Sequence, residues 1–463
     1  PSLFDSPAER YVKARQSVQR FTLVQLGKDF FFHFRYVVHS YNFFLFPSTL
    51  GIRDVEFTLS ASSIQFLSHY GFDYNKFLKD GIPYMNEVQE KILRQLLLAG
   101  TWKVCRTNNA DRDVLKRAID EVTSWIAAAK EEDTMILQDL NGYHMLEVQL
   151  VLRQALENVW TEPLGDRKVM VKKVSPEHRQ LLENSSYDHC QKKLILLSAR
   201  GFTNLFQILV KAKKPLVGHN MLMDLMHLHD KFYRPLPESY DEFKRNIHNL
   251  FPVIIDTKTV TKYMQKVRCT GKTKNLIHPL VFSSNLNPKD PPCPVIVLAS
   301  DCSRYAEKKF PHEAGYDAFL CGSVLLMSAH LLLCRSTDNA VEADPSFSQY
   351  LTVLAEHVNK VNFIRGGVSS INFSGEDAPS RHPPALVVHV RGWSGLTERQ
   401  IYQEFKAHCC FDIRRLSKNQ FIMLSNKYKH VRLVLRDYRH HPHLQVSVYR
   451  HWRHSPSVNC LLQ

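Results

Sequence analysis

The chain has 463 residues, with 60 Lys and Arg against 45 Asp and Glu, and a formal net charge of +15. Its 44% hydrophobic and 23% charged residues exclude a disordered chain and indicate folded domains, about three by length. The basic excess favours a polyanionic partner, with nucleic acid the first candidate and an anionic membrane surface the second. A basic soluble protein without such a partner would carry the same charge.

The ten cysteines are scattered along the chain and form no C-x-x-C pair. This pattern indicates neither a zinc site nor a disulfide scaffold. We expect reduced thiols in a cytosolic or nuclear compartment, and we expect no signal peptide.

Two apolar stretches rich in Phe, Tyr and Val come first in the chain. "RFTLVQLGKDFFFHF" (20–34) and "YVVHSYNFFLFP" (36–47) predict neighbouring strands. The next stretch, "SSIQFLSHYGF" (62–72), predicts a helix with serine caps. We assign residues 1–105 to the first part of a core domain.

The pattern of predicted elements changes at residue 106, and residues 106–185 predict a small α/β insertion. Amphipathic helices are expected at 112–132 and 142–160, followed by a strand at 168–175. The core domain then resumes at 186–340.

The resumed core begins with a helix expected at 196–212. A short strand ending at Val217 turns at Gly218 and opens a further helix, and "FPVIIDTKT" (251–259) predicts another buried strand. The apolar segment from Asp317 to Cys334 approaches the roughly 18 residues of a membrane span. Because it carries polar residues such as His330, we expect a buried core helix at 316–334.

A connecting helix and linker are expected at 341–382. After them, predicted strands and helices alternate to the end of the chain. Residues 383–463 predict the order β-α-β-β-α-β, which is the ferredoxin-like arrangement. Thr397 and Gln400 have the spacing of a capping box at the start of the first helix of this domain.

Three polar residues stand where α/β proteins keep their chemistry. Asp224 lies on the helix after the Gly218 turn, Asp317 begins the helix at 316–334, and His312 lies on the loop before it. Metal-assisted phosphodiester cleavage needs carboxylates that converge on hard cations and a base near the attacking water. Each residue also has an ordinary explanation, as a helix-start carboxylate, a solvated helix position or a loop histidine.

Two motifs resemble those of a known family. "GHNMLMDLMH" and "HEAGYD" resemble the second and third exonuclease motifs of the histidine-containing branch of the DEDD exonucleases. "GFDYNKFLKDGIPYMNE", "FPVIIDTK" and "HEAGYDAFLCG" are similar to the poly(A)-specific ribonuclease group. The ending "YRHWRHSPSVNCLLQ" is similar to the branch of that group that trims the 3′ ends of pre-piRNA.

The resemblance implies a fold, an activity and a set of functional residues. The fold is α/β: a ribonuclease H-like DEDD exonuclease core with a small α/β insertion and a C-terminal ferredoxin-like domain of the RNA-recognition-motif (RRM) type. The implied enzyme is a 3′→5′ exoribonuclease that trims single-stranded RNA, pre-piRNA or poly(A)-like, and releases 5′-mononucleotides. Asp224 and Asp317 would hold two Mg²⁺ ions with two further carboxylates, and His312 would take a proton from the attacking water.

The further carboxylates of the family come as D-x-E on the first strand of the nuclease sheet. Asp54 and Glu56 spell D-x-E, but they follow the two long strands instead of preceding them. We therefore expect neither to be a metal ligand, and we expect the D-x-E strand to be missing from this sequence. The chain would then bind metal poorly by itself. The alternative is a catalytically incomplete RNA-binding or scaffolding protein on a nuclease fold.

The insertion and the C-terminal domain both depart from the family pattern. The family's insertion carries an R-x-x-x-H motif, which residues 106–185 lack. In the C-terminal domain the third strand has only Phe421 as an aromatic residue, and Arg414 and Arg415 stand where the poly(A)-specific relative stacks the mRNA cap on a tryptophan. We expect these arginines to pair with RNA phosphates; a solvated basic face is an equal alternative.

The resemblance also implies partners and a location. Single-stranded RNA is the expected substrate, and a homodimer and a Tudor-domain scaffold protein are further candidates. We expect a cytoplasmic protein, anchored to an organelle membrane only through a segment beyond Gln463.

Overall fold

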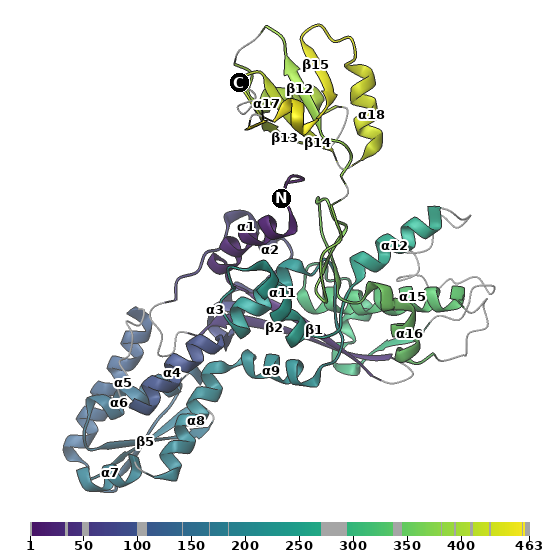
Figure 1. Cartoon of the computed structure of the whole chain (residues 1–463). Helices are drawn as coiled ribbons and strands as arrows, with labels where there is room; N and C mark the ends of the chain where they lie inside the picture. The colour runs from purple at the N-terminus through teal and green to yellow at the C-terminus, as the bar shows by residue number, and fades with distance from the viewer. Residues whose placement is uncertain are drawn as a thin grey trace.

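The structure is a computed structural model of the chain. It describes residues 2–32, 36–48, 55–99, 109–140, 142–165, 167–183, 185–269, 294–336, 345–380, 382–392, 395–407, 411–425, 427–455 and 457–458. Figure 1 shows a central α/β body, from which residues 109–200 extend at one end, and a separate lobe formed by residues 386–448.

A hairpin dominates the first sheet of the central body. β1 (Gln25–Phe32) and β2 (Tyr36–Pro47) pair antiparallel, as the two apolar stretches predict. β3 (Ile82–Tyr84) and β9 (Ile296–Leu298) pair parallel with β2. Among the described strands, β1 pairs only with β2, so one edge of β1 has no partner there.

A second sheet joins β7 (Leu216–Gly218) in parallel to β8 (Ile254–Asp256). Among the described strands β7 pairs only with β8. The helix α15 (Ala314–Ser336) packs against β1, β2 and β7 and so spans both sheets. This close approach needs glycine at position 27, because a Cβ there would lie 1.9 Å from the main-chain oxygen of Ala314.

α15 is a core helix. Its length and composition alone would allow it to cross a membrane, and it is the only such helix among the described residues. Half of its most apolar window is buried, however. Its polar residues also find partners inside the protein: Ser323 donates to the carbonyl of Phe319 at 2.9 Å, and His330 Nδ1 lies 3.1 Å from Tyr350 Oη.

Shorter elements complete the central body. The helices are α1 (Pro7–Arg20), α2 (Ala61–His69), α3 (Tyr74–Asp80), α4 (Glu87–Ala99), α9 (Phe202–Ala212), α10 (Leu222–Leu228), α11 (Tyr240–Leu250), α12 (Thr257–Cys269), α14 (Arg304–Glu307) and α16 (Phe347–Leu354). Single turns are η1 (His229–Tyr233), η2 (Ser300–Cys302) and η3 (Ala355–His357), and β10 (Lys360–Asn362) pairs with β11 (Ser370–Asn372). The β10–β11 pair lies within residues 341–382, where a connecting helix and a linker were expected and no strand was.

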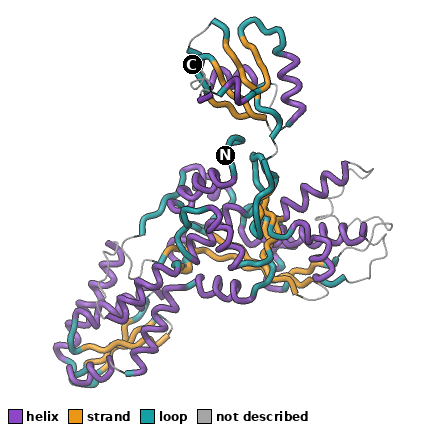
Figure 2. Tube along the Cα trace, in the orientation of Figure 1, coloured by secondary structure: helices purple, strands orange, loops and turns teal. Residues whose placement is uncertain are grey.

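The extending segment has its own hydrophobic core. Its elements are α5 (Asn109–Ala128), β4 (Thr134–Leu137), α6 (Gly142–Ala155), β5 (Val159–Gly165), β6 (Lys168–Lys173), α7 (Pro176–Glu183) and α8 (Ser186–Arg200). The strands form an antiparallel sheet in the order β4-β6-β5, and Figure 2 shows it flanked by helices. The helix expected at 142–160 is wrong at its end, because the chain leaves α6 after Ala155 and enters a strand at Val159.

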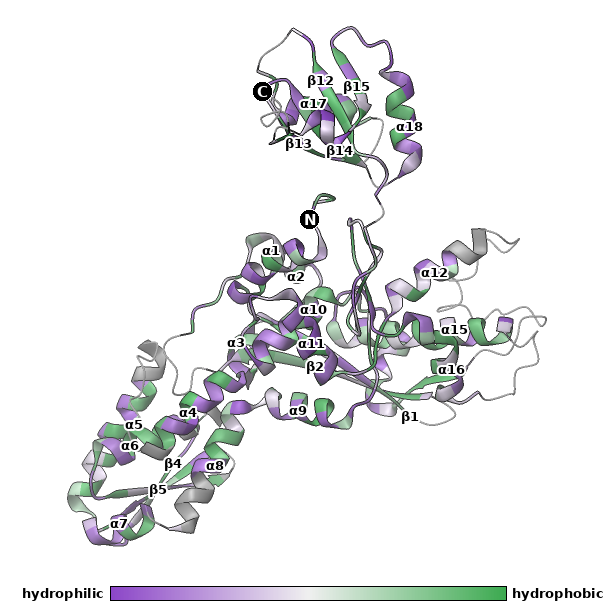
Figure 3. Cartoon of the chain, viewed as in Figure 1, coloured by the Kyte–Doolittle hydropathy of each residue, from purple (hydrophilic) through white to green (hydrophobic). Residues whose placement is uncertain are grey.

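The C-terminal lobe follows the order β-α-β-β-α-β. Its elements are β12 (Leu386–Val390), α17 (Glu398–Phe405), β13 (Phe411–Arg415), β14 (Gln420–Ser425), α18 (Tyr428–Asp437), β15 (Leu444–Val448) and a short α19 (His451–His454). The sheet order is β13-β14-β12-β15, with all neighbours antiparallel. In Figure 3 hydrophilic and hydrophobic stretches mix along α18, whose Val431 and Val434 are buried in the core of the lobe. The predicted capping box at Thr397 is present.

Candidate functional site

The turn between β7 and α10 is held in place by a carboxylate from the neighbouring strand. Asp256, at the end of β8, accepts the main-chain N–H groups of Asn220 at 2.8 Å and Met221 at 3.2 Å. Met221 offers α10 no side-chain cap, so Asp256 satisfies donors that a capping side chain would otherwise take. These two hydrogen bonds position the first turn of α10, which carries Asp224.

Part of the Asp224 side chain reaches solvent, but many protein atoms surround its carboxyl group and reduce its hydration. This desolvation, helped by the neighbouring Asp256 carboxylate, raises the pKa of Asp224 to about 6. The role of Asp256 in positioning α10 could not be predicted from the sequence, because the contact depends on the parallel pairing of β7 with β8.

Asp317 and His312 meet at the start of α15. The main-chain N–H of His312 points to Asp317 Oδ1 at 3.4 Å, and burial raises the pKa of the half-buried Asp317 carboxyl. His312 is exposed and has φ = +68°, an uncommon conformation that histidine tolerates better than bulkier residues. Its ring lies edge-on to Tyr70 at 4.3 Å and to Phe66 at 4.8 Å between ring centroids.

The two predicted carboxylates lie near one thiol. Burial, together with the charges of Asp317, Asp224 and Asp256, raises the pKa of Cys321 to about 12. Cys321 is one turn after Asp317 on α15, so both Asp317 and Asp224 act on the same part of this helix. The structure therefore places Asp317 beside the main chain of His312, and it places Asp224 on the helix after β7, a strand against which α15 packs.

A fourth carboxylate, Asp29 on β1, also acts on Cys321. Both of its oxygens are buried, and the hydroxyl of Ser40, its partner across the hairpin, lies close to them. Burial raises the pKa of Asp29 to about 7, although the nearby Ser40 hydroxyl and Lys28 oppose this shift. Sequence analysis did not single out this residue; a charged residue inside an apolar strand, "GKDFFF", is the signal that could have found it.

Replacing Asp29 with asparagine should stabilise the protein at alkaline pH. The pKa of Asp29 rises from 3.8 to about 7 on folding, so folded protein holds this proton more tightly and stability falls as pH rises between these values. Above pH 7 the ionised carboxylate costs at most about 4 kcal/mol, and the Asn variant avoids this cost. Thermal unfolding at pH 5 and pH 8 measures the effect, which should be smaller at pH 5. Asp120→Asn, at an exposed position of α5, is the matched control; an Asp29→Asn protein less stable than wild type at pH 8 would contradict the prediction.

The donor atoms of the site fit a hard divalent cation by type. Carboxylate oxygens such as those of Asp224 and Asp317 are the ligands that Mg²⁺ takes from proteins. Within the described residues, however, no group of three or more His, Cys, Asp or Glu side chains is placed to hold a metal ion. Asp54 lies outside the described residues, and Glu56 is exposed in the segment before α2.

The two arginines predicted to bind RNA are engaged within the protein. Arg414 lies 3.4 Å from Asp5 and 4.6 Å over the Phe4 ring. Arg415 donates to the carbonyl of Leu396 and stacks 5.1 Å over the ring of Phe421. The N-terminal residues around Asp5 thus contact the edge strand β13 of the C-terminal lobe.

Relatives of known family match this chain over most of its length. The model of the CAF1 family ribonucleases matches residues 1–325. The chain is 57% identical over 470 residues to the poly(A)-specific ribonuclease PNLDC1 of Mus musculus, covering 100% of this chain and 88% of the relative. It is 28% identical over 466 residues to the pre-piRNA 3′-exonuclease trimmer of Bombyx mori, covering 98% and 86%. It is also 28% identical over 368 residues to the poly(A)-specific ribonuclease PARN of Homo sapiens, covering 71% and 55%.

These matches confirm the resemblance predicted from the exonuclease motifs, including the similarity to the trimmer. The family match spans both sheets, the extending segment and the start of α15, and therefore all three candidate residues. The chain belongs to the CAF1 family of ribonucleases.

Proposed function

We propose that this protein is a metal-dependent 3′→5′ exoribonuclease that trims single-stranded RNA and releases 5′-mononucleotides. The observation that carries the proposal is that α15, which starts beside His312 and carries Asp317, packs against β7, the strand before the helix of Asp224. Two carboxylates near a loop histidine are what metal-assisted phosphodiester hydrolysis requires. The similarity to a poly(A)-specific ribonuclease and to a pre-piRNA 3′-exonuclease trimmer supports RNA as the substrate.

Each residue of the site has a distinct role in this proposal. His312 accepts the proton of the attacking water, because histidine is the side chain that most often serves as a general base. The rings of Tyr70 and Phe66 limit the orientations of the His312 ring. Asp224 and Asp317 would hold Mg²⁺, which when bound stabilises charge on the phosphate and on the departing 3′ oxygen.

We further infer that two more carboxylates reach the site on a strand that pairs between β1 and β7. Each of these strands has an unpaired edge among the described residues, and α15 packs against both. An unpaired edge presents main-chain N–H and C=O groups to an added strand. A D-x-E strand at this position would lie between the elements that carry Asp29 and Asp224.

A 5′-labelled single-stranded RNA tests the proposed function. This chain should shorten the RNA very weakly or not at all. The protein with a D-x-E strand joined before residue 1 should shorten it by single nucleotides from the 3′ end when Mg²⁺ is present. Robust digestion by the unextended chain that survives Asp317→Asn would place the chemistry elsewhere, and internal cleavage products would contradict the 3′→5′ direction.

A second function is favoured by the lack of a complete metal-ligand group among the described residues. In this alternative the nuclease fold is retained and the protein binds RNA or scaffolds a partner without cleaving RNA. The same assay separates the two: an extended protein that binds the labelled RNA with Mg²⁺ and leaves its length unchanged is a scaffold.

We also propose that the C-terminal lobe is an RRM-like domain that binds RNA through charge instead of stacking. Its strand order and its β-α-β-β-α-β sequence support this assignment. Phe421, the aromatic residue of the third strand, is fully buried in the core of the lobe and cannot stack on a base. Arg432 and Arg439 are exposed cations of the same lobe.

Charge-driven binding predicts a steep salt dependence. The affinity of the whole protein for a short oligoribonucleotide should fall with salt, with a slope of about −0.7 for each neutralised phosphate. Arg432→Gln and Arg439→Gln should each lower the slope by up to about 0.7, whereas Arg117→Gln on α5 should not change it. A cap analogue should compete poorly. Salt-insensitive binding that the analogue displaces would mean that an aromatic residue stacks on the cap, with the exposed Trp452 the first to test.

A specific RNA substrate and specific partners can also be proposed. We propose pre-piRNA 3′ ends ahead of poly(A) as the substrate, which a comparison of trimming rates on the two RNAs tests. We also propose a cytoplasmic homodimer, bound to a Tudor-domain scaffold protein and tethered to an organelle membrane through a segment beyond Gln463. Sedimentation of the purified protein and fractionation of cells that express it at full length test these points.

A further inference from the structure

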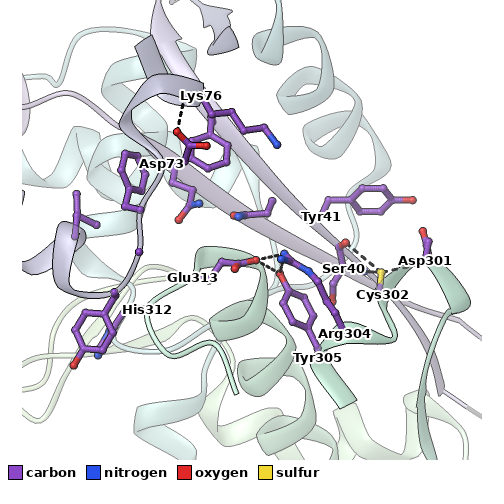
Figure 4. Close-up of a pocket in the computed structure, with 17 residues that line it drawn as sticks. Ser40, Tyr41, Asp73, Lys76, Asp301, Cys302, Arg304, Tyr305, His312 and Glu313 are labelled. Atoms are coloured by element: carbon purple, nitrogen blue, oxygen red, sulfur yellow. Dashed lines mark hydrogen bonds and ion pairs between the residues drawn. The ribbon is translucent and has the colours of Figure 1, made fainter. Parts of the chain in front are cut away.

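The Lys and Arg side chains around His312 are engaged within the protein. Figure 4 shows the cavity beside this histidine, where the Arg304 side chain points toward Glu313, with which it is paired. The ammonium of Lys76 lies 5.2 Å over the Phe44 ring. Because RNA binding depends on cations that neutralise phosphates, we looked for exposed cations elsewhere in the chain.

The outer face of the sheet in the C-terminal lobe, the face away from α17 and α18, lacks the aromatic residues that stack bases in domains of the RRM type. The inward-facing side chains of the strands, which include Phe411 and Phe421, form the core of the lobe. The outward-facing partners across the sheet are Arg414, Ile422, Val387 and Ser447 in one row and Gln420, His389 and Gln445 in the next. The described strands therefore place no Phe, Tyr or Trp on this face.

Other parts of the chain cover the same face. The N-terminal segment that contacts Arg414 also donates the main-chain N–H of Leu3 to the Asp412 carboxylate. Arg365, in the turn between β10 and β11, lies 3.5 Å from that carboxylate. Val387, in the middle of the face, is only 2% exposed. RNA could bind along this face only by displacing these contacts.

The helical layer of the lobe exposes a row of cations. Lys429, Arg432 and Arg436 stand three and four positions apart along α18, so they lie on one side of the helix, and all three are exposed. Arg436 pairs with the adjacent Asp437, whereas Lys429 and Arg432 make no ion pair within the described part of the chain. Tyr428 begins the helix and is 59% exposed. We call Tyr428, Lys429, Arg432 and Arg436 the α18 surface.

The α18 surface suits a phosphate chain better than a lipid bilayer. A helix that lies in a membrane interface inserts a free apolar face between the lipids. The apolar residues Val431 and Val434 of α18 are buried in the core of the lobe and cannot insert. Cations that pair with phosphates and one exposed ring that stacks on a base are what single-stranded RNA requires.

We propose that single-stranded RNA binds the lobe on the α18 surface, and that the outer face of the sheet instead holds the lobe to the rest of the chain. The helices cover the inner face of the sheet, so the α18 surface and the covered face lie on opposite sides of the lobe. RNA on α18 therefore leaves the contacts of Asp412 intact. This inference rests on the proposed charge-driven binding of RNA by the lobe, because it names the surface that binds.

Fluorescence anisotropy of a labelled short oligoribonucleotide with the whole chain, in EDTA and at about 0.1 M salt, tests the inference without hydrolysis. A triple variant with Lys429→Gln, Arg432→Gln and Arg436→Gln should bind about 100-fold more weakly, since each lost phosphate contact weakens binding by about fivefold at this salt. The variant should unfold at the wild-type temperature, because all three residues are exposed.

Two controls separate the surface from the net charge. Lys211→Gln, Lys214→Gln and Arg245→Gln together remove three exposed cations of the central body and should change the affinity by less than about twofold. Arg414→Gln, on the covered face, should also change it by less than about twofold. Hydrogen exchange of the amides of residues 2–5 should be the same with and without RNA.

Several results would overturn the inference. The triple variant could bind RNA as tightly as wild type, or Arg414→Gln could weaken binding as much as the triple variant does. Faster exchange of residues 2–5 in the presence of RNA would place the RNA on the sheet. A triple variant that loses binding to phosphatidylserine vesicles but keeps its affinity for RNA would make the α18 surface a membrane contact.

Failure of this inference is distinguishable from failure of the proposed function. If the extended protein trims RNA and the triple variant binds RNA normally, the exoribonuclease function stands and the inference is wrong. If binding depends on the α18 surface and the extended protein trims nothing, the inference stands and the catalytic function is wrong. A wild-type chain that binds no RNA would overturn both the inference and the proposed binding of RNA by the lobe.

Discussion

Replacing Asp317 with asparagine should abolish Mg²⁺-dependent release of mononucleotides by the protein that carries the added D-x-E strand. Asparagine keeps the shape of the side chain and removes the negative charge that a hard cation requires. Because the metal supplies several kcal/mol of transition-state stabilisation, the rate should fall at least about 10³-fold. Asp224→Asn should have the same effect. Mononucleotide release from a labelled RNA at saturating Mg²⁺ measures both.

The unfolding temperature of each Asn variant shows whether a loss of activity comes from the missing carboxylate or from an unfolded protein. Burial raises the pKa of both Asp224 and Asp317, so their ionised forms are less favourable in the folded protein than in the unfolded chain. The two Asn variants should therefore unfold at the same temperature as wild type or slightly higher when metal is absent. Asp120→Asn should keep full activity. An Asp317→Asn protein that folds and trims RNA at the wild-type rate would remove Asp317 from the mechanism.

Replacing His312 with alanine should slow the same reaction by about 10²–10⁴-fold, the usual contribution of a positioned general base. The variant should still bind RNA and Mg²⁺, since His312 is not proposed as a metal ligand. The loss should therefore appear in kcat rather than in KM. A rate that rises with pH in the variant and approaches that of wild type would be consistent with hydroxide replacing the base.

A matched control tests whether the ring or the strained loop matters. His312 has φ = +68°, so replacing it with alanine removes the ring and can also change the conformation of the loop. His312→Asn keeps a residue that tolerates this conformation and removes the imidazole. If His312→Asn restored the wild-type rate, the loop conformation would matter and proton transfer by His312 would be wrong.

Elements with strong local signals were predictable from the sequence. The apolar runs that form β1 and β2, the turn at Gly218 and the long helix α15 are all present. The helix α1 was missed, although Ser6 and Glu9 form a capping box with Pro7 at its start. The helix expected at 196–212 is broken at Gly201, where φ is +45° and a Cβ would lie 2.1 Å from the carbonyl oxygen of Pro83. That break depends on a contact distant in sequence, which local periodicity does not reveal.

The candidate site was predictable only in part for a similar reason. Asp224, Asp317 and His312 stand out because they follow turns or begin helices. The role of Asp256 arises from strand pairing, and the burial of Asp29 arises from the packing of α15 on β1. The engagement of Arg414 by Asp5 joins residues 409 positions apart, which spacing within one motif cannot indicate.

We propose that Asp224 and Asp317 share one metal site. Anomalous scattering from Mn²⁺ soaked into crystals of the protein with the added D-x-E strand tests it most directly, at pH 8, where Asp224 is ionised. We expect Mn²⁺ peaks bonded to carboxylate oxygens of both residues, and the loss of at least one peak in Asp317→Asn. Crystals of an active protein whose Mn²⁺ peaks lie away from both carboxylates would contradict it.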